Sequence, residues 1–391
     1  MTERADVVVV GLGAMGSAAA YQLAKRGVKV LGLDRFTPPH AMGSSHGDTR
    51  ITRQAVGEGT EYVPLVLDSH DIWRELEAAT GDDLLVACGL LVIAAGTGEN
   101  SHHGMRDFVS RCADAARQFA IPHELLDGRA VARRFPQFHN LAGDERAYWE
   151  PGAGYVFPER CIAAQLRRAR DLGADLRTGV EVRNIARTRD GVRVETSNGP
   201  VEAERAVVTA GAWTGPLLGD PFAGLLEVNR QVLYWYGLDK TGDYRAETPV
   251  FIWMHGATDT DYLYGFPPLP GEDSVKVATE QYHTATTPEA VRREVDPAEA
   301  EEMYRRHVEG RIAGASRRLV KAAACLYTVT PDRRFIIDRH PENDRMLVVS
   351  ACSGHGFKHS AGIGKAMAEW IVDGRPKADL SPFSLGRFGA G

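Results

Sequence analysis

Three glycines near the start of the chain are spaced for phosphate binding. Gly11, Gly13 and Gly16 form the pattern Gly-x-Gly-x-x-Gly directly after the apolar run 6–10, and a stretch of helical composition follows. The first glycine allows a tight turn, the second lets the backbone approach a pyrophosphate, and the third lets helix and strand pack closely. The first N–H groups of the helix would face the phosphates. The predicted phosphate-binding residues are Gly11, Gly13, Ala14, Met15 and Gly16.

A second strand, predicted over 28–34, ends in the acidic residue Asp34. Strand, helix and second strand form a βαβ unit, which is the setting that the glycine pattern requires. A carboxylate at this place accepts hydrogen bonds from ribose hydroxyls, which argues against a 2′-phosphate and therefore against NADP. FAD and NAD are both compatible with this unit, and an ordinary glycine-rich turn is the less favoured alternative.

The composition of the chain excludes several classes of protein. The 391 residues, with 43% hydrophobic and 25% charged, are typical of a globular protein with two or three domains. A net charge of −6 excludes a strongly basic nucleic-acid binder. No apolar run is long enough for a membrane span. The five cysteines contain no Cys-x-x-Cys pair and no basic segment precedes the first apolar run, so we expect a cytoplasmic protein without a disulfide framework.

The remainder of the chain does not continue as regular strand–helix repeats. Helices are predicted over 63–80, 105–119, 161–172 and 297–308, and an α/β pattern returns over 334–371. A nucleotide-binding fold that opens the chain and closes only at its end predicts a discontinuous domain, which favours FAD over NAD. We expect an α/β protein with a Rossmann-like FAD-binding domain and an α+β substrate domain on a mixed or antiparallel sheet. The first comprises residues 1–85, 150–220 and 320–391, and the second 86–149 and 221–319.

Several longer segments, spread over almost the whole chain, carry a family likeness. They are residues 11–16, 43–53, 209–213, 264–267, 325–332, 335–338 and 353–358. These segments resemble the monomeric sarcosine oxidase family, which includes N-methyltryptophan oxidase and pipecolate oxidase. Members are flavoenzymes that oxidise secondary amines, mostly N-methyl or cyclic amino acids, and pass the electrons to O2. The resemblance implies a monomeric FAD-dependent amine oxidase that acts on a small amino acid.

The resemblance also assigns residues to the flavin. Cys325 matches the cysteine that is linked to the 8α carbon of the flavin, whereas Cys352 lies at a position that the family does not use. The thiolate is the reactive form, so we expect a lowered pKa or basic surroundings at Cys325. Lys276 matches the lysine implicated in the reaction with O2, and His46 and Arg50 match basic residues on the flavin side. Further predicted flavin contacts are Asp34, Arg35, Ser44, Thr49, Arg50, Val180, Gly211, Gly354, His355, Gly356, Phe357 and Lys358.

A second group of residues is expected to bind the substrate. By the resemblance, Arg53 and Lys358 hold the substrate carboxylate, for which a guanidinium fork and an ammonium group are suited. Tyr264 and Tyr327 match aromatic positions of the substrate cavity. Ile252 stands where sarcosine oxidases have a methionine, a difference that concerns substrate choice more than chemistry.

The chain departs from the family pattern after Lys276. Extra residues at 279–281 precede Tyr282 and His283, relative to sarcosine oxidases. We expect them to shift the wall of the pocket, which puts His283 in doubt as a member of the site.

The expected reaction removes a hydride equivalent from the neutral amine. The imine then hydrolyses, giving formaldehyde where an N-methyl group was oxidised, and O2 reoxidises the flavin to yield H2O2. Two alternatives stay open, a flavin dehydrogenase that donates electrons to a quinone and a non-catalytic dinucleotide-binding module. No metal is expected, because the His-x-x-x-His spacing of His355 and His359 has no nearby third ligand. The sequence does not say which secondary amine is the substrate.

Overall fold

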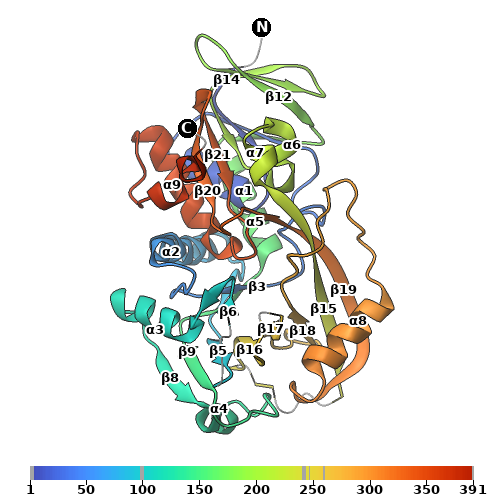
Figure 1. Ribbon diagram of the computed structural model, residues 1–391. Coiled ribbons are helices and arrows are strands. Elements are labelled where there is room, and N and C mark those ends of the chain that lie inside the picture. Colours follow the sequence, from blue (N-terminus) through green and yellow to red (C-terminus); the bar gives the residue numbers. More distant parts are fainter. Residues whose placement is uncertain (1–3, 97–100, 240–243, 246, 259, 390–391) are drawn as a thin grey trace.

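The computed structural model describes residues 4–96, 101–239, 244–245, 247–258 and 260–389. Figure 1 shows two lobes, one above the other, joined by long strands. In the described part of the chain, no helix has the length and apolar character that crossing a membrane requires.

The upper lobe is built on a parallel sheet that begins with the first residues described. Its strands lie in the order β11 (Asp175–Thr178), β2 (Val30–Asp34), β1 (Arg4–Val10), β14 (Val201–Val208) and β21 (Asn343–Ser350), each parallel to the next. Three further strands extend this sheet. β12 (Val182–Arg187) pairs with β13 (Val192–Thr196), β13 pairs with β14, and β20 (Ile336–His340) pairs with β21, each in antiparallel orientation. The run Val7–Val10 is buried because both faces of β1 are covered.

Helices from distant parts of the chain pack together against this sheet. They are α1 (Ala14–Lys25), α2 (Val63–Thr80), α5 (Pro158–Asp171) and α9 (Ser360–Val372). Helix α1 contacts both α5 and α9, and α9 also contacts α2. The C-terminal segment therefore lies beside the N-terminal βαβ unit, as Figure 1 shows for α9 and α1.

The lower lobe is built on a mixed sheet. Its strand order is β19 (Ala315–Val329), β15 (Glu227–Leu238), β18 (Ser274–Ala278), β17 (Tyr262–Phe266), β16 (Val250–Met254), β5 (Leu90–Ala94), β9 (Arg146–Glu150) and β8 (Glu124–Asp127). Only the β16–β5 pair is parallel among these neighbours. Ile252 faces Tyr264 across one strand pair, and these side chains lie on the face opposite Phe251 and Trp253.

Helices and small strands complete the lower lobe. They are α3 (Phe108–Gln118), α4 (Gly128–Arg134), α8 (Pro297–Met303) with a π-helical turn over Tyr304–Val308, and the hairpin of β6 (Ser101–His102) and β7 (Met105–Arg106). A further small sheet of β3 (Arg50–Thr52), β10 (Gly154–Val156) and β4 (Leu85–Val86) carries Arg50. It lies between the two large sheets in Figure 1.

The structure confirms the predicted α/β fold class with its second, mixed sheet. The predicted helix over 63–80 is α2. The helix predicted over 105–119 begins later, at Phe108, because Met105 and Arg106 pair with the preceding strand instead.

Candidate active site

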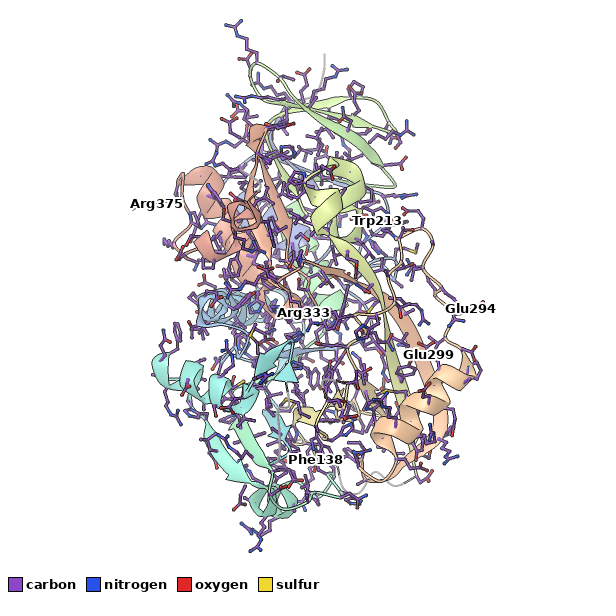
Figure 2. The ribbon with its side chains drawn as sticks, viewed as in Figure 1. Phe138, Trp213, Glu294, Glu299, Arg333 and Arg375 are labelled. Carbon is purple, nitrogen blue, oxygen red and sulfur yellow. The ribbon has the colours of Figure 1, made fainter. Side chains whose placement is uncertain are left out.

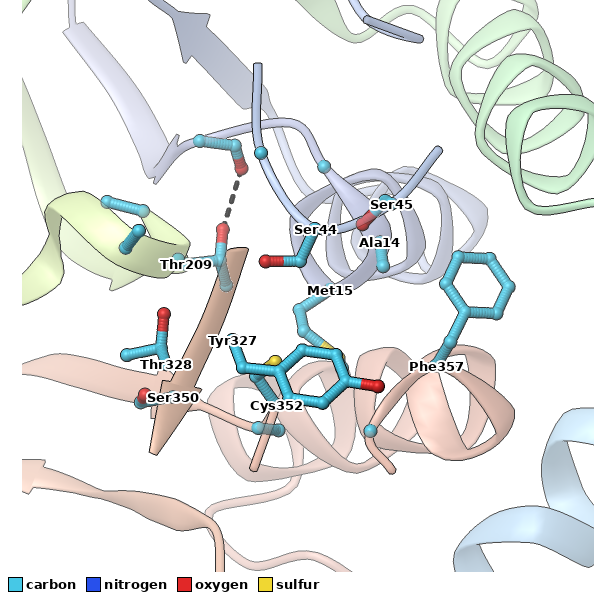
Figure 3. A pocket seen from close by; sticks show the side chains of 18 of the residues that line it. Ala14, Met15, Ser44, Ser45, Thr209, Tyr327, Thr328, Ser350, Cys352 and Phe357 are labelled. Atoms are coloured by element: carbon cyan, nitrogen blue, oxygen red, sulfur yellow. Dashed lines mark hydrogen bonds between the residues drawn. The ribbon is translucent and has the colours of Figure 1, made fainter. Parts of the chain in front are cut away.

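One cavity of about 530 Å³ brings together residues from both lobes and from both ends of the chain. Predicted site residues in its lining are Gly11, Gly13, Ala14, Met15, Asp34, Arg35, Ser44, Thr49, Arg50, Arg53, Val180, Gly211, Ile252, Tyr264, Lys276, Tyr327, Gly354, His355, Gly356, Phe357 and Lys358. Gly16, His46 and Cys325 are not among the lining residues. Figure 3 shows part of the lining, with Met15, Ser44, Tyr327 and Cys352 around the same space.

At one end of the cavity, Gly11 and Gly16 of the glycine turn pack too closely against backbone atoms to carry a side chain. Gly11 has a φ of +86°, and a Cβ there would lie 2.6 Å from the carbonyl oxygen of Thr209. At Gly16 a Cβ would lie 1.7 Å from the carbonyl oxygen of Gly11. At Gly13, by contrast, nothing lies within 4 Å. Gly13 lines the cavity, so this side of the turn is open to a pyrophosphate at the start of α1.

The carboxylate of Asp34 is fixed beside this turn. Its Oδ2 accepts a hydrogen bond from the N–H of Leu12 at 2.7 Å, and its Oδ1 accepts one from Phe36 at 2.7 Å. The residues present therefore fit FAD at this end, with backbone donors for phosphates and a carboxylate for the ribose.

Gly13 offers a test of the phosphate site, because a methyl group there meets empty space in the protein alone. We expect Gly13→Ala to keep the fold but to retain FAD at least tenfold less well, since the methyl group would occupy the space of the phosphates. Measured FAD content and the dissociation constant of added FAD check this, with circular dichroism as the control for folding. Full FAD affinity in the folded variant would contradict the placement of the phosphates.

Lys276 fastens the loop around Arg50 to the lower sheet. Its Nζ donates hydrogen bonds to the carbonyl oxygens of Gly47 and Thr49, at 2.7 and 2.6 Å, and to Thr49 Oγ1 at 3.0 Å. The guanidinium of Arg50 donates to the carbonyl oxygen of Ser44 at 3.0 Å. Burial, reinforced by the charge of Arg50, lowers the pKa of Lys276 well below its usual value. Lys276 and Arg50 therefore place two basic groups in one part of the cavity wall.

His46 lies close enough to Arg50 and Lys276 for their charges to act on it. Its side chain is buried, and its Nε2 has no hydrogen-bond partner among the described residues. Burial and the charge of Arg50 lower its pKa to about 3, so the imidazole is neutral at physiological pH. His46 is not a lining residue of the cavity, and its predicted catalytic role stays a prediction.

Arg53 and Lys358 meet at a carboxylate that sequence reasoning missed, Glu58. One guanidinium nitrogen of Arg53 donates to both carboxylate oxygens of Glu58, at 2.5 and 2.6 Å, and the Nζ of Lys358 lies 3.8 Å from Oε1. All three side chains are buried. Although burial alone would raise it, these two cations hold the pKa of Glu58 well below its usual value. Two cations against one carboxylate leave a site suited to a further anion.

Lys358 is held in the C-terminal turn that was predicted to form part of the site. Its Nζ donates to the carbonyl oxygen of His355 at 2.7 Å. Burial, opposed by Glu58, lowers the pKa of Lys358 to about 7. A bound carboxylate would raise this pKa again, because it favours the ammonium form.

A second polar group in the cavity was also missed. His103, at the β6–β7 turn, has its Nε2 2.9 Å from Oε1 of Glu280 and 3.5 Å from Oε1 of Glu58. Glu280 belongs to the segment 279–281 that was predicted to shift the pocket wall, and it lines the cavity. His283 is exposed and is not a lining residue. Glu280, and not His283, faces the cavity.

Nitrogen and oxygen atoms of Glu58, His102 and His103 lie within 4.8 Å of one another, a spacing that could hold a metal ion. Arg53 already donates to both oxygens of Glu58, and Lys358 stands nearby. Because these cations fill the surroundings of the carboxylate, the charge of the cluster favours an anion over a metal ion.

The two candidate cysteines differ in exposure. Cys325, on β19, is fully buried. A lowered pKa was one of the two expectations for this thiol, but its pKa is raised, because burial outweighs the charges of Arg50 and Lys276. The predicted basic surroundings are present in these two residues. Cys352 is half-buried and lines the cavity.

The chain matches the family of FAD-dependent oxidoreductases over residues 6–370. It belongs to that family, and FAD is its cofactor. Within the family it belongs with the sarcosine and N-methyltryptophan oxidases. It is 37% identical to monomeric sarcosine oxidase of Bacillus sp. (strain B-0618), over 99% of this chain and 97% of that protein. It is 34% identical to N-methyl-L-tryptophan oxidase of Yersinia pestis (strain Pestoides F), over 98% and 99%. The predicted family is confirmed.

Solved structures share the fold. NikD, an amino acid oxidase essential for nikkomycin biosynthesis, superposes in its open form with a TM-score of 0.83 at 25% identity, over 98% of both chains. Glycine oxidase from Geobacillus kaustophilus gives a TM-score of 0.74 at 23% identity, over 99% of both chains, which shows the fold alone.

Proposed function

We propose that the protein is an oxidase of a small secondary amino acid, either N-methylated or cyclic. The observation that carries the proposal is that Arg53 and Lys358, far apart in the sequence, both line the cavity that begins at the glycine turn and both meet the buried carboxylate of Glu58. A buried pair of cations beside a cofactor site is an anchor for a substrate carboxylate. The sarcosine and N-methyltryptophan oxidases among its relatives support a substrate of this kind.

The side chains around the anchor define the remaining roles. Arg53 and Lys358 bind the carboxylate and so orient the amine, while Tyr264, Tyr327 and Ile252 enclose it and exclude water. FAD held at the glycine turn would supply the two-electron oxidation of the amine and the reaction with O2 that yields H2O2. The imine hydrolyses in water and gives formaldehyde if an N-methyl group was oxidised.

Further assignments belong to the same proposal. The FAD-binding domain comprises 1–85, 150–220 and 320–391, and the substrate domain 86–149 and 221–319; strand membership in the two large sheets supports this division, although β19 crosses position 320. The protein acts as a monomer, in keeping with relatives named monomeric. The cytoplasm is its proposed location.

Release of H2O2 tests the proposed function. We expect the purified holoenzyme to release H2O2 with at least one of sarcosine, other N-methylated amino acids, proline and pipecolate. A dehydrogenase that uses a quinone would instead reduce an artificial quinone acceptor with these compounds and release no H2O2. Reduction of the flavin by none of them would contradict the proposal.

We also propose that FAD is attached covalently through Cys325. The support is the family match of segment 325–332, together with the nearby charges of Arg50 and Lys276, which oppose the effect of burial on the pKa of the thiol. Cys352 is the competing thiol, since it lines the cavity.

Acid precipitation distinguishes the two thiols. We expect a yellow pellet from the wild type and from Cys352→Ser, and a colourless pellet from Cys325→Ser, because only a covalent bond keeps the flavin on denatured protein. Mass spectrometry of the flavin-bearing peptide provides the second readout. A colourless pellet from Cys352→Ser, or from the wild type, would contradict the assignment.

A further inference from the structure

Glu280 is a buried carboxylate in the cavity without a permanently charged partner. Its side chain is 5% exposed. Among the residues that the structure describes, no lysine or arginine forms an ion pair with it, whereas Glu58 has two such partners. A buried carboxylate is costly unless it meets a cation or a proton. Glu280 is therefore a negative group of the cavity for which the described residues supply no lysine or arginine partner.

The hydrogen bonds of Glu280 close a ring that lacks one proton. Its Oε1 lies 2.9 Å from Nε2 of His103, its Oε2 accepts from the hydroxyl of Tyr282 at 2.9 Å, and that hydroxyl lies 2.9 Å from Nδ1 of His103. Each of the three contacts needs one proton. A neutral imidazole and a phenol supply two, and an ionised carboxylate supplies none. One added proton would complete the ring.

His103 is neutral in this ring. Burial, reinforced by the charges of Lys358 and Arg53, lowers its pKa to about 3. Burial also raises the pKa of Glu280 above its usual value. The added proton would therefore reside on Glu280 and be shared with His103.

We propose that Glu280, with His103 and Tyr282, receives the ammonium group of the substrate and accepts its proton. This inference rests on the proposed function, because an amino acid in water carries a protonated amine at neutral pH, whereas hydride removal requires the free amine. In the step, one N–H bond of the ammonium breaks and one O–H bond forms on Glu280. The products are the neutral amine and the carboxylic acid, so charge and protons balance.

The position of Glu280 relative to the carboxylate anchor suits this role. The same nitrogen of His103, Nε2, lies 2.9 Å from Oε1 of Glu280 and 3.5 Å from Oε1 of Glu58, so the ring and the carboxylate that Arg53 and Lys358 share meet at one atom. In an α-amino acid the carboxylate and the amine are bonded to the same carbon. One small substrate can therefore reach both groups.

Other charged or titratable side chains surround the ring. They are His102, Glu58, Tyr262, Tyr327, His355, Lys358 and Arg333, the last of which lies over the ring of Tyr282 at 4.3 Å and near the middle of the molecule in Figure 2. Of these, Lys358 titrates near neutral pH, so its effect must be separated from that of Glu280.

Ligand binding separates a cation site from the carboxylate anchor. N,N-dimethylglycine carries a carboxylate and an ammonium, whereas (methylthio)acetate carries the same carboxylate with a neutral sulfur. We expect Glu280→Gln to weaken the first about tenfold or more and the second less than twofold, as measured by the change in flavin absorbance on titration. His283→Ala, whose side chain is exposed beside the same segment, is the matched control and should change neither.

The pH profile tests proton acceptance. Wild-type flavin reduction, followed without oxygen, should stay nearly level above the pKa of Glu280. In Glu280→Gln the rate should rise about tenfold per pH unit toward the pKa of the amine, because only the free amine then reacts. In Tyr282→Phe the rate should rise with pH in the same way but less steeply. Without the hydroxyl, only the contact between Glu280 and His103 remains, and a neutral imidazole supplies the one proton that it needs. Lys358 is present in all variants, so its titration is common to them.

Two outcomes are decisive. If Glu280→Gln weakens both ligands equally, or if its pH profile parallels that of the wild type, the proposed role of Glu280 is wrong while the proposed function stands. If the wild type binds neither ligand and no amine reduces its flavin, the proposed function fails and this inference falls with it.

Discussion

Arg53→Ala is expected to lower kcat/KM for the amino-acid substrate by on the order of a hundredfold to a thousandfold. Truncating one partner of a buried, hydrogen-bonded charge pair costs about 2–5 kcal/mol. Two effects combine here: the substrate carboxylate loses its guanidinium partner, and Glu58, which keeps only the more distant Lys358 at 3.8 Å, would repel that carboxylate. Steady-state kinetics measured through H2O2 release provide the readout.

Related variants separate these two effects. Arg53→Lys keeps the charge but not the planar fork, so we expect a smaller loss. In the double variant Arg53→Ala with Glu58→Gln, removal of the repelling charge should recover part of the activity. An unchanged visible spectrum of the bound flavin shows that each variant is folded. A kcat/KM of Arg53→Ala within a few-fold of the wild type would contradict the carboxylate anchor.

Lys276→Met is expected to slow the reaction of the reduced enzyme with O2 by about 10²–10³-fold, while reduction by substrate changes little. Loss of one preorganised electrostatic donor has an effect of this size. The first electron transfer to O2 creates a negative charge, and Lys276 is a buried basic group in the cavity wall. Stopped-flow measurements of each half-reaction check the expectation.

Lys321 supplies the matched control for this variant. It is an exposed lysine whose Nζ forms an ion pair with Asp48 of the same loop at 2.8 Å, so Lys321→Met also removes a lysine that holds the loop. We expect normal reoxidation in that variant. Equal slowing of both half-reactions in Lys276→Met would show that Lys276 only supports the loop through Gly47 and Thr49.

Much of the cofactor half of the site could be predicted because its chemistry is encoded locally. The glycines 11–16 and Asp34 lie within one βαβ unit, so their spacing alone fixes which backbone groups and which carboxylate meet a dinucleotide. Arg53 and Lys358 were predicted as partners only through the family resemblance. The structure brings them to the same carboxylate.

The rest of the site depends on contacts between loops, which leave no local pattern. Glu58, His103 and Glu280 come from three separate segments, and an acidic residue or a histidine in a loop is usually solvated. The extra segment 279–281 was a usable signal, because it indicated a changed wall even though it did not identify Glu280. The raised pKa of Cys325 could not be foreseen, since it results from burial under a fold that the sequence does not display.

The measurement that tests the central claim most directly is reduction of the flavin without oxygen by an N-methyl amino acid and by its uncharged amide. We predict loss of the visible flavin absorbance with sarcosine or a larger N-methyl amino acid, and at least a hundredfold slower loss with the matching amide, because Arg53 and Lys358 bind only the carboxylate. Equal rates for acid and amide would contradict the account.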